Sequence, residues 1–351
     1  MREKKAGNRD NIAAGWRKIC AGFLLVGIGL LAGCGSMAAK PATTNSAGKY
    51  PEKPITVIVP FSAGGALDII ARALEKRSSK YLGQSLIVVN KPGAAGSIGL
   101  NELAGASPDG YTIGITSPEI ILNPLYGPTK YNYTTALAPI AQVSTASMVI
   151  VTRADQPWRN LTDLVQYAKL HPSELKFGNT GIGSIPHIIG ETFAQAADIS
   201  IEHVPFRGAS ETTAALLGGH IQVLIVNPMS VSDYIKAGKI RGLAVTGEHI
   251  VDPNFDQIPT LKEVGYDIVL SNWYGVAVPK EVPPEIKAKI ADGFQKIIQD
   301  PEFKQDIEKL GLPIVYLNPH DTEAVWLADQ QKYTRIIQET GILDKIKEQK
   351  K

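Results

Sequence analysis

"VPFSAGGALDII" (Val59–Ile70) is the stretch that decides the fold of this chain. It closes the apolar run 55–60, turns through two glycines and continues with apolar residues at helical spacing. A helix begins with amides that have no partners inside the helix, and its dipole favours an anion beside them. The turn therefore predicts either an anion site or, as the plainer alternative, close packing of a strand against a helix.

The same turn lacks the residues that nucleotide-binding loops require. A phosphate-binding loop of the form GxxxxGK[ST] would place a lysine and a hydroxyl after the second glycine, and a dinucleotide loop would read GxGxxG. Neither pattern fits Gly64 and Gly65. We therefore expect no cofactor.

A second turn of the same kind occurs at "GNTGIGSIPH" (178–187). It also follows an apolar strand-like run and opens a helical pattern, and it carries three glycines with the hydroxyls of Thr180 and Ser184. Packing and capping explain one such turn as well as binding does. Two turns in matching positions favour binding, because ligands of open α/β sheets sit at the carboxyl ends of strands. We expect the two sets of amides to hold one anionic group between them.

Short apolar runs alternate with helical patterns along the chain from residue 54. The order strand–helix–strand–helix–strand over 55–116 indicates a parallel sheet with helices on both faces, and the pattern restarts near residue 147. The sequence thus predicts an α/β protein with two lobes, 49–150 plus 271–351 and 151–270. The extended runs 147–152 and 267–279 are the expected crossings, which would form a two-strand hinge.

Residues 1–33 have the composition of a signal peptide. Six Lys or Arg residues accompany the apolar run "ICAGFLLVGIGLLAG", which is shorter than the roughly 20 residues that span a bilayer. The run ends in "LAGC", a pattern similar to the bacterial lipobox, so we expect Cys34 to become the lipid-modified first residue. The Gly-, Ala- and Ser-rich segment 34–48 would be a flexible tether. Removing a leader of net charge +4 from a chain of +2 leaves about −2, so we expect no nucleic-acid binding.

Several stretches together resemble the Bug, or TctC-like, receptors of tripartite tricarboxylate transporters. Besides the two glycine turns, the resemblance rests on "VVNKPGAAGSIGLNELAGASPDGYTI", "HVPFRGASETTAALLGGHIQV", "IPTLKEVGY" and "NWYGVAVP", and it covers nearly all of the chain from Tyr50 to beyond Gly311. It implies a two-lobed, Venus-flytrap fold like that of type II periplasmic binding proteins. It also implies that the two strand–helix loops capture the carboxylate of a small ligand.

The resemblance places candidate ligand-binding residues in those loops and around them. In the loops they are Phe61, Ser62, Ala63, Gly64, Gly65, Asp68, Thr180, Gly181, Ile182, Gly183, Ser184 and His187, and by analogy the pocket also includes Ser117, Phe206, Asn227 and Trp273. Asp68 lies in a helix's first turn, where it would organise the loop rather than touch an anion. Trp273 and Phe61 could equally be core residues. His171 and His203 have no partners at metal-ligand spacing in the sequence, and His187 is a single histidine on a helix, so we expect no metal site.

The expected function is an extracytoplasmic, lipid-anchored and monomeric receptor that passes a small organic acid to membrane permease subunits. The acid could be a dicarboxylate, a tricarboxylate, an aromatic acid or an amino acid, and the anchor could face a periplasm or the outside of the cell membrane. One alternative is a sensory lipoprotein with another partner. A hydrolase with Ser62 or Ser184 as nucleophile is a weaker alternative, since neither serine lies in GxSxG and we expect no enzyme activity.

Overall fold

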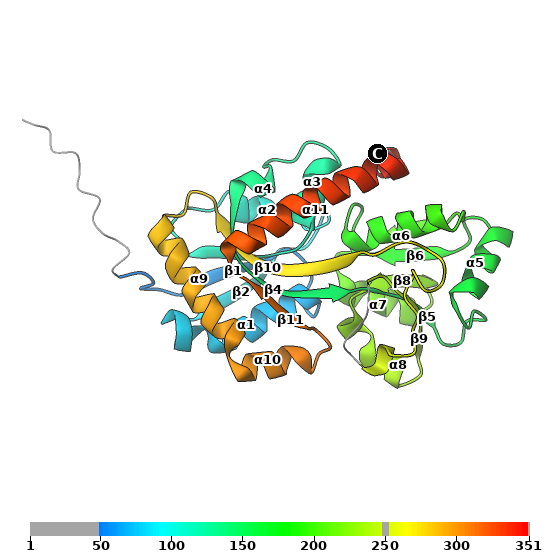
Figure 1. The fold of residues 1–351 in the computed structure, drawn as a ribbon, viewed down its shortest axis with the longest axis horizontal. Helices are drawn as coiled ribbons and strands as arrows, with labels where there is room; N and C mark the ends of the chain where they lie inside the picture. Colours follow the sequence, from blue (N-terminus) through cyan, green and yellow to red (C-terminus); the bar gives the residue numbers. More distant parts are fainter. Residues whose placement is uncertain (1–48, 248–252, 350–351) are drawn as a thin grey trace, which may run out of the picture. The chain divides into compact units, whose positions relative to one another are not determined.

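The computed structural model describes residues 49–247 and 253–349, which contain two β-sheets with helices packed against them (Figure 1). The first sheet has six strands in the order β11-β4-β10-β3-β1-β2. These are β1 (Ile55–Val59), β2 (Leu86–Asn90), β3 (Thr112–Thr116), β4 (Leu137–Ser147), β10 (Ser271–Pro279) and β11 (Ile314–Leu317). β1 pairs in parallel with β2 and β3, whereas β10 runs antiparallel to β3 and β4. The predicted parallel order is therefore right for the first three strands, and the whole sheet is mixed.

The second sheet has five strands in the order β7-β6-β8-β5-β9. These are β5 (Val149–Arg153), β6 (Lys176–Asn179), β7 (Glu202–Pro205), β8 (Val223–Val226) and β9 (Ile240–Val245). β6 pairs in parallel with β7 and β8, and β5 pairs antiparallel with β8 and β9. Both sheets thus have a parallel part followed by an antiparallel strand, which is the two-sheet α/β architecture expected from the sequence.

The helices of the first sheet lie on both of its faces (Figure 1). They are α1 (Ala66–Leu82), α2 (Ser97–Ala104), α3 (Glu119–Leu125), α4 (Tyr133–Ala136), α9 (Pro284–Gln299), α10 (Pro301–Glu308) and α11 (Pro319–Thr340). Successive residues of β1 face opposite sides of the sheet. Val57 belongs to the apolar core that includes α1, α9 and α10, and Ile58 belongs to the core that includes α2 and α3. The continuous apolar run of β1 is explained by this burial on both faces.

The helices of the second sheet are α5 (Leu161–Leu170), α6 (Ile185–Ala196), α7 (Ala209–Leu217) and α8 (Ser232–Lys236). Short 3-10 turns occur at Pro228–Ser230 and Pro253–Phe255. The α5 helix begins at the predicted cap, because the side chain of Asn160 accepts a hydrogen bond from the amide of Asp163 at 2.8 Å. α6 and α7 follow β6 and β7 directly, so their N-termini lie at the carboxyl ends of these strands.

The chain passes from the first sheet to the second between β4 and β5 and returns at the start of β10. Thr246 ties these two crossings together. Its hydroxyl accepts a hydrogen bond from the amide of Met148 at 3.0 Å and donates one to the carbonyl of Leu270 at 2.8 Å. The two crossings are therefore coupled by hydrogen bonds at one side chain.

The C-terminal helices carry a buried apolar face as well as the charged face that is evident in the sequence. Trp326 and Tyr333 of α11 are buried, and the last helix, α12 (Ile342–Gln349), buries Ile342 and Ile346. These residues belong to the same apolar core as Ile188 of α6, and α12 contacts α6. The last helix thus reaches the second sheet's helices, although the sequence assigned 271–351 to the first lobe; the lobe boundaries themselves stay predictions.

No helix within 49–247 and 253–349 is long and apolar enough to cross a membrane. The expected signal peptide (1–33), the lipid-modified Cys34 and the tether (34–48) lie outside the described residues.

Candidate functional site

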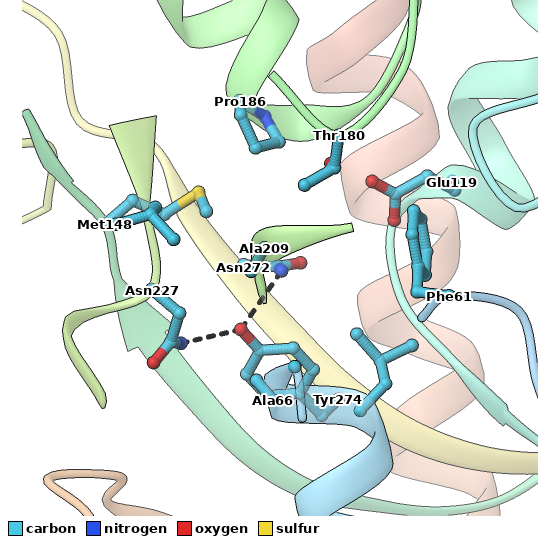
Figure 2. Close-up of a pocket in the computed structure, with 13 residues that line it drawn as sticks. Phe61, Ala66, Glu119, Met148, Thr180, Pro186, Ala209, Asn227, Asn272 and Tyr274 are labelled. Carbon is cyan, nitrogen blue, oxygen red and sulfur yellow. Dashed lines mark hydrogen bonds between the residues drawn. The ribbon is translucent and has the colours of Figure 1, made fainter. Parts of the chain in front are cut away.

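A cavity lies where the carboxyl ends of β1 and β8 meet the crossing strands β4 and β10 (Figure 2). Its volume is about 50 Å³, which is room for about four water-sized groups. It is lined by Phe61, Gly65, Ala66, Leu67, Glu119, Met148, Thr180, Pro186, Ala209, Val226, Asn227, Asn272 and Tyr274. The lining comes from both sheets and mixes apolar surface with a few polar groups, which is typical of a small-molecule site.

The first glycine turn presents open backbone amides to this cavity. Gly65 is the N-cap of α1 and has no side-chain capping bond, and the amides of Gly65, Ala66 and Leu67 have no hydrogen-bond partner in the part of the chain that the structure describes. All three residues line the cavity. The first turn of α1 can therefore donate hydrogen bonds to an anion, with the helix dipole adding to the attraction.

Asp68 holds this turn in place, as expected from the sequence. Its carboxylate accepts hydrogen bonds from the amide of Gly64 at 2.9 Å, from Arg72 at 3.0 Å and from the side-chain amide of Asn90 at 3.0 Å. Burial alone would raise the pKa of Asp68, but these hydrogen bonds outweigh burial and hold the pKa below its usual value. Asp68 is therefore ionised at neutral pH and positions the loop from behind.

The second glycine turn differs from the first, because other groups of the protein already bind most of its amides. The amide of Gly181 donates to Asn179 at 2.9 Å, that of Gly183 donates to His187 at 3.0 Å, and that of Ile185 donates to Glu119 at 3.1 Å. The two turns are alike in sequence and unlike in their hydrogen bonds. The first turn therefore has more open backbone amides than the second.

Glu119 is the ionisable residue of the cavity that the sequence analysis missed. It is the first residue of α3, its side chain is buried, and it accepts hydrogen bonds from the hydroxyl of Ser117 at 2.5 Å and from the amide of Ile185. Burial raises the pKa of Glu119, against the lowering effect of these two bonds. Ser117, a predicted ligand contact, thus orients Glu119. The sequence "TSPEI" offered a signal, since Ser117 and Glu119 follow a strand that ends beside β1.

Asn227, another predicted residue, lines the cavity and joins the two sheets. Its side-chain amide donates to the hydroxyl of Tyr274 at 2.7 Å (Figure 2), while its side-chain carbonyl accepts from the amide of Met229 at 3.1 Å. Asn272 also donates to Tyr274, at 3.2 Å. Burial raises the pKa of Tyr274, so the hydroxyl stays neutral. Tyr274 and Asn272 were not predicted from the sequence, where their neighbour Trp273 was the predicted contact.

That neighbour, Trp273, points to the opposite side of β10 and does not line the cavity. Its indole nitrogen donates to Asp329 of α11 at 2.8 Å, and its ring stacks on Trp326. Successive side chains of a strand face opposite ways, so Trp273 lies away from the cavity that Asn272 and Tyr274 line. Trp273 is a core residue, which was the alternative interpretation.

The other predicted residues fall into three groups. Phe61 and Thr180 line the cavity with Gly65. Gly181, Ile182 and Phe206 line a neighbouring, more open cavity beside residues 93–97. Ser62 and Ala63 contact α7 of the second sheet, where Ser210 donates to the carbonyl of Ala63 at 2.9 Å and Ser62 lies 3.5 Å from Glu211. These contacts join the loop after β1 to α7 at the edge of the site.

Ser184 and His187 lie behind the second turn. Both are fully buried, and His187 is brought together with Glu191 and His203, whose ligand atoms all lie within 4.8 Å of one another. The imidazole of His187 accepts the Gly183 amide at Nδ1, so in the neutral ring the proton is on Nε2, which lies 3.9 Å from Glu191. That proton occupies the position a metal would need, so the arrangement favours support of the loop over metal binding. Sequence spacing could not show that His203 joins this group.

The sequence and the fold have counterparts among known proteins. The model of the family named TctC, described as the tripartite tricarboxylate transporter family receptor, matches residues 70–342. This chain belongs to that receptor family. The match covers more than half of the 351 residues and includes the second glycine turn, Glu119 and β10.

Relatives of known sequence or structure agree with this assignment. The chain is 32% identical over 306 residues to the "UPF0065 protein in gbd 5'region" of Cupriavidus necator, covering 87% of this chain and 93% of the relative. It is 30% identical to the periplasmic binding protein BugD, with a TM-score of 0.79 over 84% of this chain and 99% of BugD. R. palustris Rpa4515, solved with adipate, is 26% identical, with a TM-score of 0.78 over 83% of this chain and 98% of that protein. The chain is therefore a receptor of the periplasmic binding protein type.

Proposed function

We propose that this receptor binds a small organic acid in the cavity between its two sheets and delivers the acid to the membrane permease of a tripartite tricarboxylate transporter. The observation that carries the proposal is the row of open amides at Gly65, Ala66 and Leu67, which lines a buried cavity. A hydrogen bond to a charged group contributes roughly 1.5–3 kcal/mol. Three such bonds supply roughly 4.5–9 kcal/mol before the cost of ordering the ligand, so binding near the micromolar range, about −8 kcal/mol, also requires contacts with the rest of the cavity.

The solved relative Rpa4515 supports an acid as the ligand, because that protein was solved with adipate. The family is one of receptors, so we propose binding without catalysis. Delivery to a permease follows from the family description, and lipid attachment at Cys34 follows from the leader sequence.

A thermal-shift screen against carboxylic acids and amino acids tests the proposal. An acid present at a hundred times its dissociation constant should add about 2.7 kcal/mol to the free energy of unfolding. If neutral sugars stabilise the protein and no acid does, the proposal is wrong.

The variant Ala66→Pro tests the role of the amides directly. Ala66 is the first residue of α1, a position that accepts proline, and Gly65 before it has the extended conformation that proline requires. Proline removes one amide hydrogen from the cavity and leaves the helix intact, so we expect acid affinity to fall about tenfold. The matched control Ala66→Gly keeps the amide and should retain most of the affinity. Equal affinities of the two variants would contradict the assigned donors.

Mass spectrometry of the membrane fraction tests the anchor. We expect a lipid on Cys34 and release of the protein into the soluble fraction in Cys34→Ala. Uptake of the acid by cells should then require both this protein and the permease.

A further inference from the structure

The carboxyl group of Glu119 is a fixed acidic group inside the proposed ligand cavity. Its residue is 3% exposed, and Figure 2 shows the carboxylate beside Thr180, with Phe61 next to it. No lysine, arginine or histidine lines the cavity, and no cationic side chain forms an ion pair with Glu119 among the described residues. Buried charges in proteins are normally paired, and without a cationic partner the burial of Glu119 raises its pKa and disfavours the ionised form.

Glu119 also occupies the place where an anionic ligand would otherwise bind the second turn. Its Oε1 atom accepts the amide of Ile185, the first residue of α6, at 3.1 Å. The next residue, Pro186, has no amide hydrogen to offer. A ligand carboxylate placed at this end would face the carboxyl group of Glu119, and two carboxylates at short range cannot both stay ionised without a cost.

The opposite end of the same cavity has the reverse polarity. There the amides of Gly65, Ala66 and Leu67 are open donors at the positive end of the α1 dipole. Near the centre, the side-chain oxygen of Asn272 is buried and has no hydrogen-bond partner, although its nitrogen donates to Tyr274. The side-chain oxygen of Asn272 is thus a second acceptor that is open to a donor on a ligand.

These groups together define the charge pattern of the ligand. We propose that the ligand is a small acid that also carries a cationic amino group, as amino acids do. Its carboxylate binds the first turn of α1, and its ammonium group binds Glu119, with the Asn272 oxygen as a further acceptor. The inference rests on the proposed function and narrows it to one class of acid.

The size of the cavity limits such a ligand. A volume of about 50 Å³ is smaller than an amino acid needs, so the site must open to admit one and excludes a long chain. The ammonium group would supply the charge that Glu119 lacks, so ligand binding would pair a carboxylate that is otherwise buried alone. Glu119 would then determine specificity, by favouring amino-bearing acids and disfavouring acids with a second carboxylate at the same end.

Calorimetry at pH 7.5 with matched ligands tests this inference on the mature protein. The pairs are aspartate with succinate, and alanine with propionate; each pair differs by an amino group in place of hydrogen. We expect at least tenfold tighter binding of the amino-bearing member of the pair that fits the cavity. Succinate or propionate binding as tightly as its partner in wild-type protein would overturn the inference, and this measurement needs no variant.

The variant Glu119→Gln tests the role of the side chain. It keeps an oxygen for the Ile185 amide and removes the charge, so the preference for the amino-bearing acid should fall at least tenfold. The control Glu308→Gln, at an exposed residue of α10, should keep the wild-type preference. An unchanged preference in folded Glu119→Gln would also overturn the inference. Binding of simple acids alone would leave the proposed function standing, whereas binding of no acid would refute both.

Discussion

Gly183 lies directly against the ring of Tyr126, and this contact joins the loop before α6 to the end of α3. A Cβ atom added to Gly183 would be 2.7 Å from two ring carbons of Tyr126, and the residue has a φ of +89°, in the left-handed region. Tyr126 is 3% exposed and is packed in the core that also contains Ile185. The approach of the second turn to the first sheet's helices therefore requires glycine here.

Gly183→Ala should weaken ligand binding by pushing these two elements apart. Because neither the backbone conformation nor the space suits a side chain, we expect at least a tenfold loss of acid affinity in calorimetry, with about 1–2 kcal/mol of lost stability. Gly238→Ala is the control: it has a similar left-handed φ of +66° but nothing within 4 Å. It should lose stability and keep affinity. Equal affinities of the two variants would show that the Tyr126 contact does not govern the site.

Asp68→Asn should damage the first turn without touching the ligand. The substitution removes the charge that holds the Gly64 amide and Arg72, so the open amides of α1 lose their fixed geometry. We expect affinity for the acid to fall about fivefold to tenfold and the free energy of unfolding to fall by about 1–3 kcal/mol. Asp163→Asn, in the first turn of α5 and not among the residues that line the cavity, is the control for the charge change. A greater affinity in Asp68→Asn would instead indicate that Asp68 repels the ligand.

The glycine turns show how much of the site could be predicted from the sequence. The patterns around 59–70 and 178–187 correctly predicted strands followed by helices, because apolar periodicity and glycine report local structure. Their different hydrogen bonding could not be predicted, because it depends on Glu119, which is 66 residues from Ile185 in sequence. The strand β4 was also missed: "LAPIAQVSTAS" contains a proline and many small polar residues, and its pairing with β10 comes from distant sequence. Lobe boundaries and ligand contacts depend on such distant pairings, so they stay predictions until ligand binding is measured in the variants.

Tyr274→Phe should weaken the junction between the two sheets at the cavity. The hydroxyl of Tyr274 accepts hydrogen bonds from Asn227 and Asn272, and its loss leaves two buried amide groups without an acceptor. Each unsatisfied group costs about 1–3 kcal/mol, so we expect lower stability together with several-fold weaker acid binding. Tyr234→Phe, at a residue 37% exposed in α8, is the matched control and should behave as wild type. Unaltered stability of Tyr274→Phe in urea unfolding would contradict the network.

Asp300 gives the fold a pH dependence that is independent of the ligand cavity. Its carboxylate accepts the Tyr81 hydroxyl at 2.6 Å and Lys80 at 3.1 Å, and it caps α10 through the amides of Glu302 and Phe303. The Tyr81 hydrogen bond, with smaller help from Lys80 and the two amides, holds the pKa of Asp300 well below its usual value. A lowered pKa in the folded state stabilises the protein above the unfolded-state pKa of about 3.9, and this stability is lost as the pH falls below that value.

Asp300→Asn should therefore be least stable relative to wild type at neutral pH. We expect a deficit of about 1–2 kcal/mol in urea unfolding at pH 7, because asparagine can still cap the helix while the charge-assisted bonds to Tyr81 and Lys80 are weakened. The deficit should shrink as the pH is lowered from 5 to 3, since wild-type Asp300 takes up a proton on unfolding there. Asp292→Asn, which removes an exposed ion pair with Lys296, should change stability by less than about 0.5 kcal/mol. If the deficit in stability stays constant over this pH range, Asp300 has the same pKa in the folded and the unfolded protein, and the prediction is wrong.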